Sequence, residues 1–465
     1  MTRPTLISAG VALLACSAAP LNAAEPRSTG EIIAMIDAAT EHSTIRVPAG
    51  VYHGRLSVQK AVRLEGGGEV VIDGGGTGNV VELLAPGIEF RGFTVRGSGS
   101  RVEMEPAAIF AGVGPVVIED CRIDDALFGI DLRQASGSMV RGNFVMGRDL
   151  DPGRSGDGVR LWWSHDCLIE NNTVVNSRDM VFWYSRNLRI LGNRVSGSRY
   201  GLHFMYSHDT LVEDNILTRN SVGAYLMYSQ GITVRGNSMT RNRGASGYGI
   251  GLKDCDDIFI ESNAFLANRV GVYIDNSPSS TESWGLFVQN TFAFNEIGLL
   301  ATPNTHDNVF TSNAFIENEE QAGVHGRGAL ALNTFARDGV GNFWSDYNGF
   351  DRTGDGVGDM PYEPRSLFEN LLASEPNLRF FLHSPAQQAV EFTARALPEL
   401  RPQPKLIDPH PLVRPPKIVA LAAEEPSEGR GAMLAISLAL VGVASLTAWR
   451  LGRDPAPIKR ERTRR

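Results

Sequence analysis

A short phrase recurs through the middle of this sequence: an asparagine, then any residue, then an apolar residue. Successive copies lie between 20 residues apart (313 to 333) and 29 residues apart (143 to 172). Recurrence at such a period indicates a repeat architecture, whose units bury their apolar faces only by stacking on one another. The phrase places Asn at positions 143, 172, 193, 215, 237, 263, 290, 313 and 333.

Each period has room for about three short strands. Alternating apolar residues, as in Gly201-Leu202-His203-Phe204 and Leu188-Arg189-Ile190, are typical of strands that bury one face. The 50 glycines and 24 prolines disfavour long helices. The prediction is therefore an all-β fold, a right-handed parallel β-helix over 46–340 with 20–29 residues per coil and asparagines at the corners, each bonded to its neighbours above and below. Cys121 takes the Asn place one period before Asn143.

The exposed ends of such a stack need covers, because bare strand edges aggregate. Ser28 or Thr29 can cap a helix whose apolar residues close the first coil, so residues 25–45 are expected to form an N-terminal capping helix. A C-terminal cap is expected over 341–370, followed by a Pro-rich linker over 371–430.

Both ends of the chain carry export and membrane signals. Residues 1–24 are typical of a signal peptide, although Leu13 to Cys16 also resembles a lipoprotein cleavage box, which leaves lipidation of Cys16 open. An uncharged run within 431–451 precedes a basic tail over 452–465. This pattern predicts a C-terminal transmembrane helix, a cytoplasmic tail and a body in the periplasm. The net charge of −8 argues against a nucleic-acid partner.

Three cysteines follow the signal peptide, namely Cys121, Cys167 and Cys255, with no CxxC pair and no zinc spacing. Cys167 and Cys255 fall four coils apart, which is about 19 Å at the spacing of stacked strands and too far for a disulfide. Three free thiols are expected.

Four consecutive coils can be aligned on Ser164, Ser185, Ser207 and Ser229. The alignment gathers large side chains on the outward face and at the corner, where an ordinary exported protein would show small polar residues. Such a surface is typical of a partner-binding site. Its members are Trp162, Trp163, Trp183, Tyr184, Tyr206, Tyr225 and Tyr228.

Two methionines fall in the same outward column. Met205 and Met227 would lie ~4.8 Å apart on adjacent coils, with His203 two residues before Met205 on the same face. Two thioethers and an imidazole suit a soft cation such as Cu(I), so these residues are a candidate copper site. Packing against a loop or a partner is the alternative interpretation of the same column.

A second candidate metal site follows the repeats. Residues 351–359 read Asp-Arg-Thr-Gly-Asp-Gly-Val-Gly-Asp, similar to the start of a calcium loop, although Tyr362 stands where an EF-hand has Glu. A tight Asx and Gly turn is the alternative. The calcium ligands would come from Asp351, Thr353, Asp355, Val357 and Asp359.

Asn342-Phe343-Trp344-Ser345-Asp346-Tyr347, followed by residues 351–364, resembles the closing signature of the NosD family. The resemblance extends to Val47-Pro48-Ala49-Gly50-Val51-Tyr52, to Val71-Ile72-Asp73-Gly74-Gly75-Gly76 and to the Asn-marked coils, and so covers about residues 29 to 370. It implies a periplasmic β-helix accessory protein that supplies copper to apo nitrous oxide reductase. The implied partners are an ABC-type permease and ATPase and a copper chaperone. No set of copper ligands comes with the resemblance.

The main alternative is a β-helix enzyme or binding module that acts on acidic polysaccharide. Asp254, Asp256 and Asp257 lie together, as do Asp124 and Asp125. Neither group has a neighbouring motif that would complete a catalytic acid and base. Solvated corners account for these carboxylates equally well, so the sequence predicts a binding protein and no catalytic residue.

Overall fold

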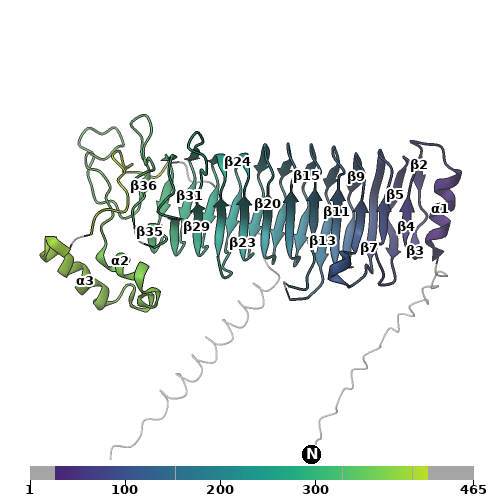
Figure 1. Cartoon of the computed structure of the whole chain (residues 1–465), viewed down its shortest axis with the longest axis horizontal. Coiled ribbons are helices and arrows are strands. Elements are labelled where there is room, and N and C mark those ends of the chain that lie inside the picture. Colours follow the sequence, from purple (N-terminus) through teal and green to yellow (C-terminus); the bar gives the residue numbers. More distant parts are fainter. Residues whose placement is uncertain (1–26, 152, 327, 401, 417–465) are drawn as a thin grey trace, which may run out of the picture. The chain divides into compact units, whose positions relative to one another are not determined.

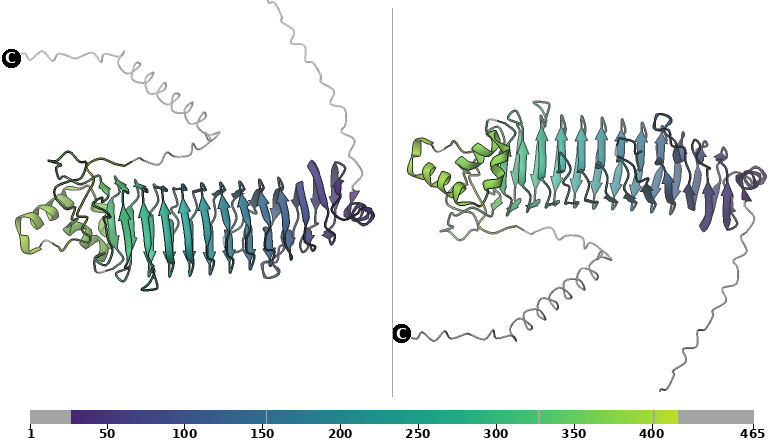
Figure 2. Two further views of the ribbon diagram at one scale, coloured as in Figure 1. Left: turned by 90° about the horizontal axis from the view of Figure 1, so that it is seen from above. Right: turned by 90° about the horizontal axis from the view of Figure 1, so that it is seen from below.

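The computed structural model describes residues 27–151, 153–326, 328–400 and 402–416. Within them the strands stack in parallel as a right-handed β-helix, which confirms the predicted fold class of the body (Figure 1). Most coils contribute three strands, and two views from opposite sides show that the stack is regular along its length (Figure 2). The predicted signal peptide and the transmembrane helix at 431–451 lie outside the described residues. Within the described ranges, no helix is long and apolar enough to cross a bilayer.

The first stack of strands is a sheet of its own, sheet B, and carries the candidate site. Its strands are β4 (Leu56–Val58), β6 (Val81–Leu83), β8 (Ala107–Ala111), β11 (Phe128–Arg133), β14 (Val159–Trp162), β17 (Asp179–Trp183), β20 (Tyr200–Met205), β23 (Val222–Met227), β26 (Tyr248–Lys253), β29 (Val270–Asp275), β32 (Ile297–Ala301) and β35 (Glu320–Val324).

The other two stacks form one sheet, because the long strands β5 and β7 run through both. The second stack holds β2 (Thr44–Arg46), β5 (Arg63–Asp73), β7 (Ile88–Arg96), β9 (Val116–Glu119), β12 (Met139–Arg141), β15 (Leu168–Glu170), β18 (Arg189–Leu191), β21 (Thr210–Glu213), β24 (Gln230–Arg235), β27 (Asp256–Glu261), β30 (Gly285–Val288) and β33 (Asn308–Thr311). The third adds β1 (Arg27–Ser28), β3 (Gly50–His53), β10 (Arg122–Ala126), β13 (Phe144–Gly147), β16 (Thr173–Val175), β19 (Arg194–Ser196), β22 (Ile216–Thr218), β25 (Ser238–Thr240), β28 (Ala264–Leu266), β31 (Thr291–Ala293), β34 (Ala314–Ile316) and β36 (Phe343–Trp344).

The corner asparagines form a hydrogen-bonded ladder, as predicted. In each step the backbone N–H and the side-chain amide of one Asn donate to the Oδ1 of the next, for example from Asn193 to Asn215 at 2.9 and 3.0 Å. The predicted last member is wrong: Asn313 donates to Asn342, not to Asn333. Asn333 instead accepts from Asn308, 25 residues before it, and so belongs to a neighbouring corner.

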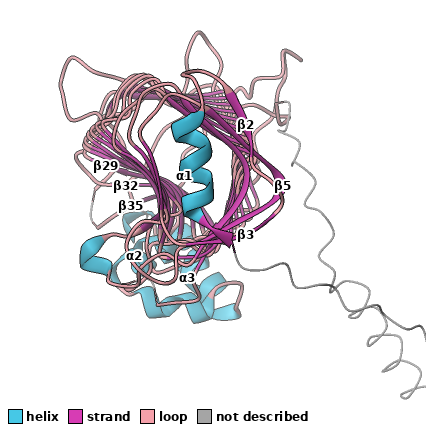
Figure 3. Ribbon diagram, turned by 90° about the vertical axis from the view of Figure 1, so that its right-hand side faces the viewer, coloured by secondary structure: helices cyan, strands magenta, loops and turns pink. Residues whose placement is uncertain are grey.

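The N-terminal end is closed by α1 (Thr29–Ala38), which lies across the first coil in the view along the stack (Figure 3). Ser28 caps the helix in a capping box with Glu31, and Ile32 and Ile36 are buried beneath it. Lys60 donates to three carbonyl groups at its C-terminus, the negative end of the helix dipole.

At the far end, β36 closes the last coil. The ring of Trp344 stacks on Phe315 with centroids 4.2 Å apart, and its Nε1 donates to Asp408 at 2.9 Å. The residues beyond differ from the expected linker. They include α2 (Leu367–Ser374), η2 (Pro376–Phe381), α3 (Pro385–Ala396) and η3 (Pro398–Leu400). Ser366 and Ser384 cap α2 and α3, and Pro385 stands at the start of α3, where a missing N–H costs nothing.

Candidate functional site

The outward face of sheet B carries the candidate copper residues. On four successive strands the inward side chains are only 0–1% exposed, as strand alternation predicts, and this fixes the orientation of each strand. These side chains are Leu161, Phe182, Phe204 and Leu226. Trp162, Trp183, Met205 and Met227 are register partners on successive strands, and all four are partly exposed. Met205 and Met227 are therefore direct neighbours on β20 and β23, as the repeat spacing predicts.

The neighbouring outward column is buried. Arg160, Val181 and His203 occupy it in register, and they are only 2%, 0% and 4% exposed. Glu105, which follows the short helix η1 (Val102–Met104), covers Arg160, and Asp157 lies 3.9 Å from the same guanidinium. Strand alternation alone does not reveal this cover, because Glu105 lies 55 residues before Arg160 in the chain.

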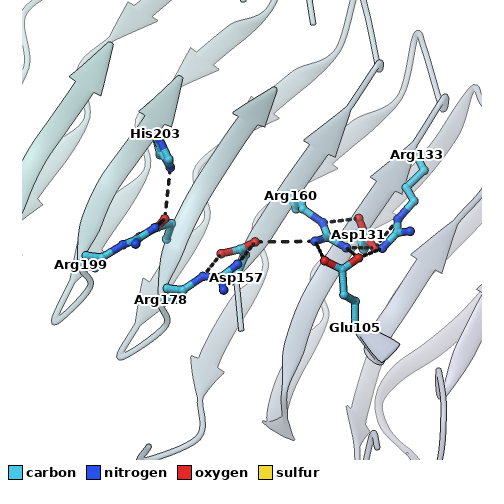
Figure 4. A network of polar contacts seen from close by, with 9 residues as sticks. Glu105, Asp131, Arg133, Asp157, Arg160, Arg178, Arg199 and His203 are labelled. Carbon is cyan, nitrogen blue, oxygen red and sulfur yellow. Dashed lines mark hydrogen bonds and ion pairs between the residues drawn. The ribbon is translucent and has the colours of Figure 1, made fainter. Parts of the chain in front are cut away.

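Beneath this cover lies a network of ion pairs (Figure 4). The guanidinium of Arg160 forms two hydrogen bonds with Asp131 at 3.0 and 2.7 Å and two with Glu105 at 2.9 and 3.0 Å. Burial alone would raise the pKa of Glu105, but Arg160 and Arg133 outweigh it and hold that pKa below its ordinary value. Burial raises the pKa of Asp157 despite the bidentate contact from Arg178. The network pins the covering segment to the sheet.

His203, two residues before Met205 on β20, belongs to a second, separate group of polar contacts (Figure 4). Its Nδ1 lies 3.2 Å from Oδ2 of Asp179, a carboxylate that Arg199 also binds. Its Nε2 is buried and has no hydrogen-bond partner in the described residues, and the same holds for Nε1 of Trp183. The Trp183 and Tyr200 rings pack edge-on against the imidazole, with centroids 5.7 and 4.8 Å away. The sequence pattern did not single out Asp179 and Arg199. The only regularity that links them is their separation by one coil.

A buried imidazole nitrogen without a partner is costly unless something occupies it. Met205 follows His203 by two residues on β20, and Met227 is its register partner on β23. Thioether and imidazole donors suit a soft monovalent cation. Met205, Met227 and His203 are therefore the residues that could hold copper as a cargo.

The corner beside this face carries a column of stacked rings. Trp163, Tyr184, Tyr206 and Tyr228 follow one another with centroids 5.1, 5.3 and 4.9 Å apart. All four have φ near +50°, a region that bulky side chains seldom adopt. Each ring face is covered by the next ring, so the column presents edges to solvent rather than open faces for sugar stacking. His165, Arg186 and His208 line the shallow groove beside it.

The calcium prediction is not supported. The carboxylate of Asp351 accepts hydrogen bonds from the backbone N–H groups of Gly354 and Gly356, and Asp355 and Asp359 accept from those of Val357 and Arg352. These oxygens are used within the loop, as in the alternative Asx and Gly turn. No group of three or more His, Cys, Asp or Glu in the described ranges could bind a metal ion.

The carboxylates of the enzymatic alternative are also taken up by structural contacts, in the first cluster with the next coil. Asp254 accepts from Asn276, Asp256 from the backbone of Ser279 and Ser280, and Asp257 from Ser283. Asp124 and Asp125 pair with arginines.

The fold and the site together define a parallel β-helix protein whose outer face carries partly exposed methionines and aromatic rings beside a buried imidazole. The model of the family described as "Periplasmic copper-binding protein (NosD)" matches residues 137–349. Two relatives carry the name "Probable ABC transporter binding protein NosD". The one from Pseudomonas aeruginosa is 33% identical and aligns over 79% of this chain and 87% of its own length. The one from Stutzerimonas stutzeri is 30% identical over 80% and 87%. This chain belongs to the NosD family.

Among solved structures, the A-module of mannuronan C-5 epimerase AlgE6 from Azotobacter vinelandii aligns with a TM-score of 0.52 and 17% identity. The alignment covers 68% of this chain and 97% of that module. At this identity the likeness shows the β-helix fold alone.

Proposed function

We propose that this chain is a periplasmic accessory protein that binds Cu(I) and assists copper-centre assembly in nitrous oxide reductase. The observation that carries the proposal is the in-register pair Met205 and Met227 beside a buried imidazole with an unpartnered nitrogen. Soft donors of this kind favour Cu(I) over the harder cations. The family description as a copper-binding protein supports the same cargo.

The proposed partners are an ABC-type permease and ATPase, a copper chaperone and the apo-reductase. The relatives' printed name supports an ABC transporter. The partner surface of Trp162, Trp163, Trp183, Tyr184, Tyr206, Tyr225 and Tyr228 borders the methionine pair, so a chaperone docked there would meet the copper residues.

Attachment to the inner membrane by residues 431–451 is part of the proposal. The helical region that precedes this segment exposes Phe380 and Phe392, whose exposed fractions are 90% and 72%. Large apolar side chains so exposed suit a membrane surface or a membrane-embedded partner.

The test is a strain that lacks this protein, complemented by variants. Met205→Leu with Met227→Leu keeps side-chain volume and removes both thioethers. We expect the exported reductase to lack its catalytic copper cluster in the deletion strain and to regain little of it with the double variant. The purified double variant should bind Cu(I) at least tenfold more weakly, measured by competition with a chromogenic Cu(I) chelator.

The matched control is Met104→Leu, which removes an exposed thioether from η1. It should restore cluster content fully. Normal copper content in the deletion strain would refute the proposed role, and unchanged Cu(I) affinity of the double variant would remove the site.

A further inference from the structure

The two nitrogens of the His203 ring have opposite surroundings. Nδ1 lies 3.2 Å from Oδ2 of Asp179, whereas Nε2 is buried without a partner in the described residues. An ionised carboxylate can only accept, so the proton of a neutral imidazole sits on Nδ1 and the lone pair on Nε2. The hydrogen bond therefore selects the tautomer whose free nitrogen is a metal donor.

Asp179 is itself held rigidly. Its side chain is 1% exposed, and it accepts hydrogen bonds from Nε of Arg199 at 3.0 Å and from the backbone N–H of Tyr200 at 3.1 Å. A second guanidinium nitrogen of Arg199 also contacts it. The carboxylate has no free direction in which to bind a cation, and its negative charge is paired with the positive charge of Arg199.

The imidazole is also fixed by its neighbours on the sheet. Tyr200, which anchors Asp179 through its backbone, packs its ring against His203, and Trp183 packs from the preceding strand. The ring cannot turn to exchange its two nitrogens without breaking the bond to Asp179 and displacing these aromatic side chains.

From this arrangement we infer that Asp179 is the positioning residue of the copper site and that Arg199 sets its charge selectivity. Asp179 fixes the tautomer and orientation of His203, so that Nε2 presents its lone pair. Arg199 cancels the carboxylate charge, so that the donors offered to the cation are neutral. Hard or divalent cations gain most from anionic oxygen, whereas Cu(I) binds well to neutral thioether and imidazole donors. The inference rests on the proposed copper site and deepens it.

The first test reads the tautomer in the metal-free, full-length protein. Nitrogen NMR with ¹⁵N-labelled histidine distinguishes the two imidazole tautomers, and His203→Gln identifies the signal. We expect His203 to be protonated on Nδ1 and Asp179→Asn to populate the Nε2-protonated form. Protonation on Nε2 in the unaltered protein would overturn the inference, whatever the metal data show.

The second test uses Ag(I), which resembles Cu(I) and does not change oxidation state, and Zn(II). Asp179→Asn should weaken Ag(I) binding about 10- to 100-fold, the usual effect of removing an outer carboxylate from a ligating histidine. Arg199→Met should leave Ag(I) binding within about threefold and strengthen Zn(II) binding at least tenfold, because the carboxylate then becomes available. The matched controls are Asp124→Asn and Arg122→Met, which alter a similar Asp–Arg pair that contacts no histidine.

The outcomes separate this inference from the proposed function. If Ag(I) affinity falls in the methionine double variant but not in a folded Asp179→Asn, the copper site stands and Asp179 has no positioning role. If the methionine variant binds Ag(I) normally, the copper site itself fails. Should Asp179→Asn not fold, Arg199→Met still decides, because unchanged Zn(II) affinity there overturns the selectivity argument.

Discussion

At the scale of single residues, the corner asparagines have a role that few other side chains could fill. Asn215 is fully buried; its Oδ1 accepts from the backbone and side chain of Asn193, and its Nδ2 donates to Ile190 O and to Asn237. The residue before it, Asp214, has φ of +56°, so the chain turns sharply there. The amide thus satisfies the backbone groups that the turn removes from the strand ladder.

Replacing Asn215 with Ala should therefore be costly. The backbone N–H of Asn193 would stay buried without a partner, at ~1–3 kcal/mol, and the carbonyl of Ile190 and the side-chain amides of Asn193 and Asn237 would each lose one hydrogen bond. We expect the free energy of unfolding to fall by roughly 3 kcal/mol in urea titrations. Asn348→Ala, at an exposed position, is the control and should change it by less than about 0.5 kcal/mol. Equal effects of the two substitutions would contradict the role of the ladder.

At the scale of elements, the helices α2 and η1 are held against the stack by ion pairs between residues far apart in the sequence. α2 is fastened to the last coil by Lys405, which contacts Glu320 and, at 3.1 Å, Glu369. Burial raises the pKa of Glu369 to about 7, with a further increase from Glu320, while Lys405 opposes the shift. η1 is held in the same manner by Glu105 and Arg160.

The pKa of Glu369 predicts how the cap responds to pH. A carboxyl whose pKa is higher in the folded state binds its proton more tightly there, so it contributes stability at low pH that is lost as pH rises to about 7. Between pH 5 and pH 8, thermal or urea unfolding should therefore show a loss of order 1 kcal/mol that Glu369→Gln abolishes. Glu375→Gln, on an exposed residue at the end of α2, should leave the pH dependence unchanged. An identical pH dependence in all three proteins would refute this assignment.

At the scale of the whole molecule, the β-helix has one continuous core that runs from α1 to β36. All three cysteines of the described chain are free and buried in it, as expected from their coil spacing. Burial raises the pKa of Cys121, Cys167 and Cys255 to about 12, 11 and 12, so none offers a thiolate to a metal or an oxidant at neutral pH.

Thiol reactivity should consequently report the integrity of the stack. In the native protein we expect none of the three cysteines to react with a disulfide reagent within minutes at pH 8. All three should react once the chain is unfolded in guanidinium. Rapid labelling of a thiol in the native state, located by mass spectrometry, would show that the core opens locally at that coil.

The sequence determined the features that recur from one coil to the next. The period, the strand alternation and the corner asparagines placed Met205 beside Met227 and aligned the aromatic column, because stacked coils bring residues one period apart into contact. The last ladder step did not follow from the repeat, because Asn333 matches the motif but lies on the corner of Asn308, whereas Asn313 bonds to Asn342.

Only the tertiary structure decided what covers the stack. Glu105 and Arg160 are 55 residues apart, and Lys405 and Glu320 are 85 residues apart, so no local period links them. The hydrogen bond from His203 to Asp179 depends on the side-chain conformations that the neighbouring rings and Arg199 impose. The segments that cover the stack are held by ion pairs and by packing. Their partners come from different coils, so these contacts form only once the coils have stacked.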